Sequence, residues 1–120
     1  MGDQISWHVE LAVRPGQLAN FRELTGEMVE STRAEPGVLS YQRCVSDDGQ
    51  FVHAYERYAN STAAVAHLQK FRKRFGGRFL AMVDRTRFTV FGHPSDELRG
   101  LLDRLGATYL KPFDDFAYWA

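Results

Sequence analysis

Hydrophobic and polar residues alternate from Ile5 to Val13, near the start of the chain. A period of two is typical of a strand with one buried face. Pro15 and Gly16 end this strand, and Gly16 can cap the N-terminus of a helix. Hydrophobic residues then recur every three or four positions, which predicts an amphipathic helix that ends before Pro36. The buried stripe of this helix consists of Leu18, Phe21, Leu24, Met28 and Thr32.

Two further strands are predicted at residues 38–45 and 51–58, and the short polar turn between them makes the pair a hairpin. A second helix follows, with Asn60 or Ser61 as its N-cap. Its hydrophobic residues again recur every three or four positions. They are Val65, Leu68, Phe71, Phe75, Phe79 and Met82.

The end of the second helix carries two glycines, Gly76 and Gly77, which indicate a kink or a close backbone contact. A fourth strand is predicted at residues 87–91. Ser95 can cap a third, shorter helix, and Gly106 is a natural C-terminal stop for it. The stripe of this helix is Leu98, Leu101, Leu102 and Leu105.

The order of elements is strand, helix, hairpin, helix, strand, then an additional helix and tail. Two strand–helix–strand units predict an α+β fold with a ferredoxin-like sheet and both main helices on one face. We expect one domain over residues 1–120. Its core would be residues 1–92, and residues 93–120 would form the C-terminal helix and tail.

The third strand is partly hydrophobic on both faces, although two helices can cover only one face of the sheet. The sequence therefore predicts that the uncovered face packs against the same face of a second copy, in a homodimer. The tail is rich in aromatic residues, which either pack on their own subunit or exchange onto the partner. These residues are Tyr109, Phe113, Phe116, Tyr118 and Trp119.

Composition excludes several classes of protein. Fifteen basic and fifteen acidic residues cancel, so no overall charge attracts nucleic acid or a membrane surface. The basic run from Lys70 to Arg78 is read as a solvated helix face, since no nucleic-acid recognition motif accompanies it. No hydrophobic run reaches the length of a membrane span. The single cysteine, Cys44, cannot form an internal disulfide, and we expect a cytoplasmic protein.

Three segments resemble the antibiotic biosynthesis monooxygenase-like family, which includes quinol monooxygenases. They are residues 13–16 (VRPG), residues 32–41 (TRAEPGVLSY) and the stretch from Tyr55-Glu56-Arg57-Tyr58 to Ala66-His67-Leu68. The resemblance covers about three quarters of the chain in the order of the family. It implies a ferredoxin-like domain that dimerises sheet to sheet into an α+β barrel.

The same resemblance implies a monooxygenase that uses O2 on an electron-rich aromatic substrate, such as a quinol or anthrone, without a metal or flavin cofactor. Two other functions are compatible with this fold. One is haem binding and degradation, with His67 as the axial ligand. The other is a non-catalytic small-molecule-binding dimer.

Three residues are predicted to be catalytic. His67 lies at the edge of the hydrophobic stripe of the second helix, and imidazole can act as a base near neutral pH. A buried histidine that only bonds a strand carbonyl is the structural alternative. Glu56 shares a strand face with hydrophobic residues, where it is either a base or the partner of Arg43 or Arg57 in an ion pair. Tyr58, closest to the helix start, can orient a phenolic substrate.

Four further residues are predicted to bind substrate. Tyr41 and Tyr55 can donate hydrogen bonds, and Arg43 can stabilise a substrate oxyanion or superoxide. His8 can line a pocket from the first strand, or it lies on a solvated face. The histidines show no metal-ligand spacing, so no metal site is expected.

Overall fold

The computed structural model describes residues 3–116. Its five-stranded sheet has the order β2-β3-β1-β4-β5, with every neighbouring pair antiparallel except β4 and β5. The elements are β1 (Ile5–Val13), α1 (Leu18–Arg33), β2 (Val38–Val45), β3 (Phe51–Tyr58), α2 (Ser61–Arg74), α3 (Gly76–Met82), β4 (Val83–Phe91), α4 (Asp96–Arg104) and β5 (Thr108–Leu110). This α+β architecture confirms the predicted fold class.

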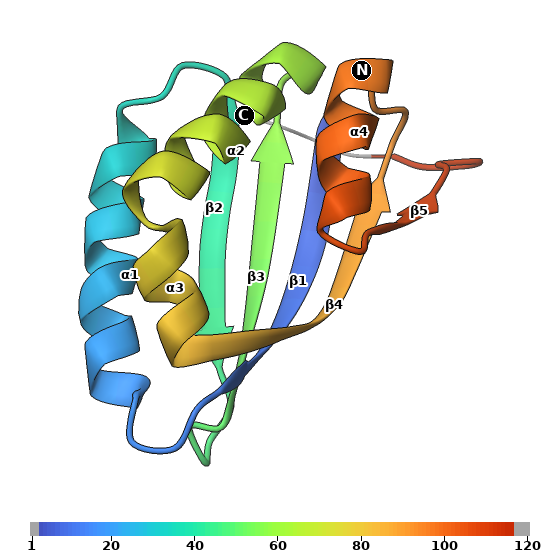
Figure 1. Ribbon diagram of the computed structural model, residues 1–120. Helices are drawn as coiled ribbons and strands as arrows, with labels where there is room; N and C mark the ends of the chain where they lie inside the picture. The colour runs from blue at the N-terminus through green and yellow to red at the C-terminus, as the bar shows by residue number, and fades with distance from the viewer. Residues whose placement is uncertain (1–2, 117–120) are drawn as a thin grey trace.

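Among residues 3–116, all four helices lie on the same face of the sheet, and the opposite face carries no helix (Figure 1). The alternation that predicted β1 is visible in its burial. Ile5, Trp7, Val9 and Leu11 are buried under the helices, and the residues between them are partly exposed. β1 therefore forms the centre of the core.

The predicted helices are confirmed with changes at their ends. Gln17, not Gly16, precedes α1, because Gly16 has a φ of +79° and belongs to the preceding turn. Asn60 caps α2 by accepting a hydrogen bond from the backbone N–H of Ala63 at 2.9 Å. The predicted interruption divides the second helix at Phe75 into α2 and α3.

The C-terminal part differs most from the expectation. β4 begins at Val83 instead of residue 87, and the short strand β5 was not expected at all. Ser95 caps α4 as predicted, with its hydroxyl accepting from the N–H of Leu98 at 3.2 Å. In the tail, Phe113 is 98% exposed. Tyr118 and Trp119 lie outside the described residues.

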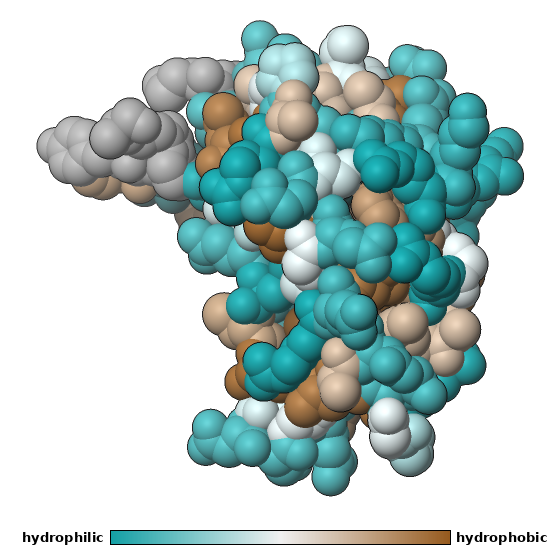
Figure 2. Space-filling model, turned by 90° about the vertical axis from the view of Figure 1, so that its left-hand side faces the viewer, coloured by the Kyte–Doolittle hydropathy of each residue, from teal (hydrophilic) through white to brown (hydrophobic). Residues whose placement is uncertain are grey.

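The surface over α1 and the adjoining sheet edge is mostly hydrophilic, with hydrophobic side chains in separate patches (Figure 2). This agrees with an amphipathic α1 whose outer side faces water. None of the helices in residues 3–116 is long and apolar enough to cross a membrane.

Candidate active site

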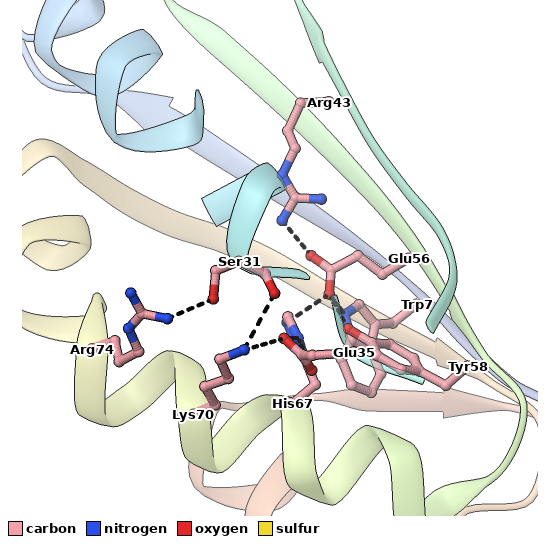
Figure 3. Close-up of polar contacts among 9 residues, drawn as sticks. All are labelled: Trp7, Ser31, Glu35, Arg43, Glu56, Tyr58, His67, Lys70 and Arg74. Carbon is pink, nitrogen blue, oxygen red and sulfur yellow. Dashed lines mark hydrogen bonds and ion pairs between the residues drawn. The ribbon is translucent and has the colours of Figure 1, made fainter. Parts of the chain in front are cut away.

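The buried carboxylate of Glu56 is the centre of the site (Figure 3). Its Oε1 accepts hydrogen bonds from Trp7 Nε1 at 2.9 Å and from the Tyr58 hydroxyl at 2.5 Å. Its Oε2 forms an ion pair with Arg43 Nη2 at 2.6 Å. The register of the sheet builds this arrangement, because Trp7 of β1 and Tyr41 of β2 both pair with Glu56 of β3.

These donors decide the charge of Glu56. Burial alone would raise the pKa of this carboxyl, but the charges of Arg43 and His67 and the hydrogen bonds from Tyr58 and Arg43 lower it below its ordinary value. Glu56 is therefore an anion at neutral pH. The ion pair with Arg43, one of the two partners considered from the sequence, is confirmed.

His67 lies on the buried face of α2 and is only 4% exposed. Its Nδ1 lies 3.1 Å from Glu35 Oε1, and its Nε2 lies 3.7 Å from Glu56 Oε1. The structural alternative, a histidine bonded only to a strand carbonyl, is not what the structure shows, since the ring is held by Glu35, a carboxylate from the α1–β2 loop. Lys70 Nζ lies 3.7 Å from the other oxygen of Glu35, so a cation of α2 also fixes that carboxylate (Figure 3).

The two tyrosines near Glu56 differ in their surroundings. Burial and the charge of Glu56 raise the pKa of Tyr41 to about 12. Burial and the same carboxylate raise the pKa of Tyr58 well above its ordinary value. Both hydroxyls are therefore protonated at neutral pH, and each can donate a hydrogen bond. Tyr41 also stacks under the Arg43 guanidinium, whose central carbon lies 3.3 Å from the ring centroid.

A cavity of about 340 Å³ opens between the sheet and the helices, beside this cluster. Trp7, Tyr41, Arg43, Glu56 and His67 form its polar side. Hydrophobic residues from the sheet and from all four helices or their ends form most of the remainder, among them Phe21, Phe71, Phe79, Phe88, Leu101 and Leu105. A ligand in this cavity would meet the carboxylate of Glu56, the imidazole of His67 and the guanidinium of Arg43 beside a largely hydrophobic wall.

The structure brings four of the predicted site residues to this cavity and leaves three elsewhere. Arg43, Tyr41, Glu56 and His67 line it, whereas Tyr58 lies fully buried behind Glu56.

His8 and Tyr55 lie on the opposite face of the sheet, in a shallow hollow of about 290 Å³. There His8 Nε2 lies 2.9 Å from His53 Nδ1. Within residues 3–116, no group of three or more His, Cys, Asp or Glu side chains is placed to hold a metal ion.

Two residues of the site were not predicted. Glu35 lies in the segment of residues 32–41 that resembles the family. Nothing in the sequence of this loop indicates that its carboxylate reaches His67 on α2. Trp7 was assigned only to a buried strand face. Its indole N–H needs a partner in the core, and this signal could have linked it to Glu56.

A family model described as antibiotic biosynthesis monooxygenase matches residues 5–85, more than half of the chain. The chain therefore belongs to this family. The matched region contains the complete Glu56 cluster with its partners on β1, β2, β3 and α2.

Several solved structures share the fold. MupZ from Pseudomonas fluorescens is 20% identical, with 97% of this chain and 95% of that chain covered and a TM-score of 0.87. SnoaB from Streptomyces nogalater, described as a cofactor-independent oxygenase, is 14% identical, with 78% and 95% covered and a TM-score of 0.66. Rv0793 from Mycobacterium tuberculosis is 25% identical, with 78% and 97% covered and a TM-score of 0.58. No protein of curated function matches the chain.

Proposed function

We propose that this chain is a cofactor-independent monooxygenase that oxidises an electron-rich aromatic molecule, such as a quinol or anthrone, with O2. The observation that carries the proposal is the buried pair of Glu56 and His67 on the wall of a largely hydrophobic cavity. Family membership and the oxygenase description of SnoaB support it.

The chemistry begins with a proton. When Nδ1 of His67 donates to Glu35, Nε2 is the free acceptor, and it faces the cavity next to Glu56. Transfer of a substrate proton to Nε2 creates an imidazolium between two carboxylates, which stabilise it. His67 is therefore the proposed base, and Glu35 is a positioning residue that fixes its tautomer and orientation.

The remaining steps need only the substrate anion and O2. For a carbon acid the balance is R–CH2–R′ + O2 → R–CO–R′ + H2O. The carbanion gives one electron to O2, and the radical and superoxide combine into a peroxide. The peroxide then loses water as the second C–H proton leaves. Arg43 and Tyr41 line the cavity, and in this proposal Arg43 stabilises the superoxide or the substrate oxyanion while Tyr41 donates a hydrogen bond to it.

Tyr58 has an indirect role in this proposal. Its hydroxyl donates to Glu56 from behind and does not reach the cavity, so it positions the carboxylate and keeps it ionised. Trp7 does the same from β1 while also forming part of the cavity wall.

Oxygen uptake tests the proposal directly. We expect a panel of quinols and anthrones to contain at least one compound whose oxidation the purified protein accelerates, with the activity unchanged by EDTA. His67→Ala should lower the rate at least 100-fold, as expected for loss of a general base. His93→Ala is the matched control, because His93 is exposed on the loop before α4. If every substrate fails, or if His67→Ala retains full activity, the proposed mechanism is wrong.

The two alternatives are distinguishable. A haem-binding protein would use His67 as the axial ligand, whereas our proposal expects no haem site. Titration with haemin would show no shifted Soret band. A purely binding protein would keep ligand affinity without any oxygen uptake.

We also propose that the chain forms a homodimer through the uncovered face of the sheet. Phe51 on that face is 47% exposed, and four other residues of the face form the shallow hollow with His8 and Tyr55. A second copy would remove this surface from water.

A further inference from the structure

β4 contains a bulge that reverses the direction of its side chains. Glu10 of β1 pairs with Arg87 and Leu11 pairs with Arg85, so Thr86 is an extra residue in β4. Its hydroxyl donates to the carbonyl oxygen of Glu10 at 3.0 Å. Without the bulge, strand alternation from Phe88 would place Arg85 on the uncovered face of the sheet. With it, Arg85 lies opposite the buried Leu11, on the side of the cavity.

The environments of Arg85 and Arg87 therefore contrast. Arg87 is 70% exposed and pairs with Glu10 at 3.7 Å on the uncovered face. Arg85 is half-buried in the cavity wall, and it has no hydrogen-bond or ion-pair partner among residues 3–116. Burial lowers the pKa of its guanidinium, which reflects the cost of removing this cation from water.

The wall of the cavity as a whole carries more positive than negative charge. Arg43, Arg72, Arg85 and Arg104 contribute cations to its wall, and Glu56 contributes the one carboxylate among its described lining residues. That carboxylate is already bound to Arg43. A second nitrogen of Arg43, Nη1, is buried without a hydrogen-bond partner among the described residues. The cavity thus offers donors and positive charge that no part of the described chain satisfies.

We propose that Arg85 binds a carboxylate of the ligand, so that the substrate is an aromatic carboxylic acid held with its charged end at β4 and its reacting end at Glu56 and His67. This deepens the proposed function and rests on it for the reacting end alone. From the strand spacing and rise, the Cα atoms of Arg85 and Glu56 are about 16 Å apart. Both residues line the cavity, and its volume of about 340 Å³ lies in the range of small-molecule sites.

A matched pair of probes tests this inference by calorimetry. 2-Naphthoate and 2-naphthamide have the same shape and differ in charge. We expect the native protein to bind naphthoate about 10- to 100-fold more tightly, as expected for a charge-assisted hydrogen bond in a partly buried site. Arg85→Met should reduce the preference to about twofold or less, and Arg85→Lys should restore part of it. Arg87→Met, a loss of the same charge on the opposite face of β4, should keep the full preference.

The inference is overturned if native protein binds both probes equally, if it binds neither at millimolar concentration, or if Arg85→Met keeps the preference while melting like the native chain. These results are independent of oxygen uptake. A carboxylate preference without turnover would leave the binding site standing and remove the proposed reaction. Turnover of quinols without a preference for the carboxylate would support the proposed reaction and remove the carboxylate site at Arg85.

Discussion

Glu56 combines two properties that rarely occur together, full burial and a stable negative charge. A carboxylate loses much hydration energy in a protein interior, and only paired donors can offset the loss. Trp7, Tyr58 and Arg43 together supply these donors on both oxygens. The charge is thus maintained by residues of three neighbouring strands, and it can in turn stabilise a proton on His67.

Replacement of this carboxylate tests its contribution to stability. Glu56→Gln leaves Arg43 buried without an ion-pair partner, and we expect it to lower the free energy of unfolding by about 3 kcal/mol at pH 7. The folded pKa of Glu56 lies below its ordinary value of 4.5, so its contribution is complete above that pH. It is lost as the pH falls from 4.5 through the folded pKa.

Urea unfolding at several pH values measures this difference. The gap between native protein and Glu56→Gln should be constant above about pH 5 and shrink in more acidic solution. Glu30→Gln, which removes only an exposed pair with Arg33 at 3.6 Å, should change stability by less than about 0.5 kcal/mol. A gap that stays constant down to pH 3 would contradict the assigned direction of the pKa shift.

At the level of elements, the turn between α1 and β2 connects the site to the start of α2. Glu35 of this turn reaches His67, and the carbonyl oxygen of Gly37 accepts a hydrogen bond from the N–H of Ala59 at 2.8 Å. Gly37 has a φ of +88°, which favours glycine, and an added Cβ would lie 2.8 Å from the Cβ of Ala63 in the first turn of α2. The close approach fixes how far α2 lies from the loop that orients its histidine.

Gly37→Ala should therefore destabilise the protein through two effects, the left-handed backbone and the collision with Ala63. Gly16→Ala is the matched control, because Gly16 has a φ of +79° with no atom within 4 Å of an added Cβ. We expect a loss of about 1 kcal/mol for Gly16→Ala. For Gly37→Ala we expect about 2–3 kcal/mol, measured by thermal or urea unfolding. Equal losses would show that the contact with α2 contributes nothing.

The sequence predicted those features that depend on local pattern. Alternation in β1, the Asn60 cap and the helix break at Phe75, beside Gly76 and Gly77, each follow from neighbouring residues. The bulge at Thr86 and the bond from Glu35 to His67 depend on pairing between distant segments, and no short pattern encodes them. The same distinction, between local pattern and contacts of distant segments, applies to the predicted site residues.

Strand position alone placed some of the predicted site residues correctly and others not. Arg43 and Glu56 could be paired because adjacent hairpin strands share a face. Tyr55 is next to Glu56 in the sequence, and because side chains alternate along a strand it points to the other face of the sheet. Tyr58 was expected to contact substrate, but its depth behind Glu56 could not be read from its place on the strand.

For the whole molecule, the one-sided helix layer has two consequences. It encloses the cavity on one face of the sheet, with α4 completing the wall next to β4. In the described part of the chain, it leaves the other face without a helix (Figure 1). That uncovered face carries Phe51 and the contact between His8 and His53. The proposed chemistry and the proposed dimerisation are thus assigned to opposite faces of one sheet, and variants can separate them.

Phe51→Lys should convert the proposed dimer into a monomer, because a charge within the contact between two copies is costly to desolvate. Light scattering after gel filtration gives the mass. Leu80→Lys is the matched control, since Leu80 is 51% exposed, compared with 47% for Phe51, but belongs to α3 on the helix side.

A chain ending at Gly106 tests the tail in the same assay: a dimer of unchanged stability rules out tail exchange as its cause. If the native chain is already monomeric at micromolar concentration, the proposed dimer is wrong, whereas the cavity and its charges are unaffected.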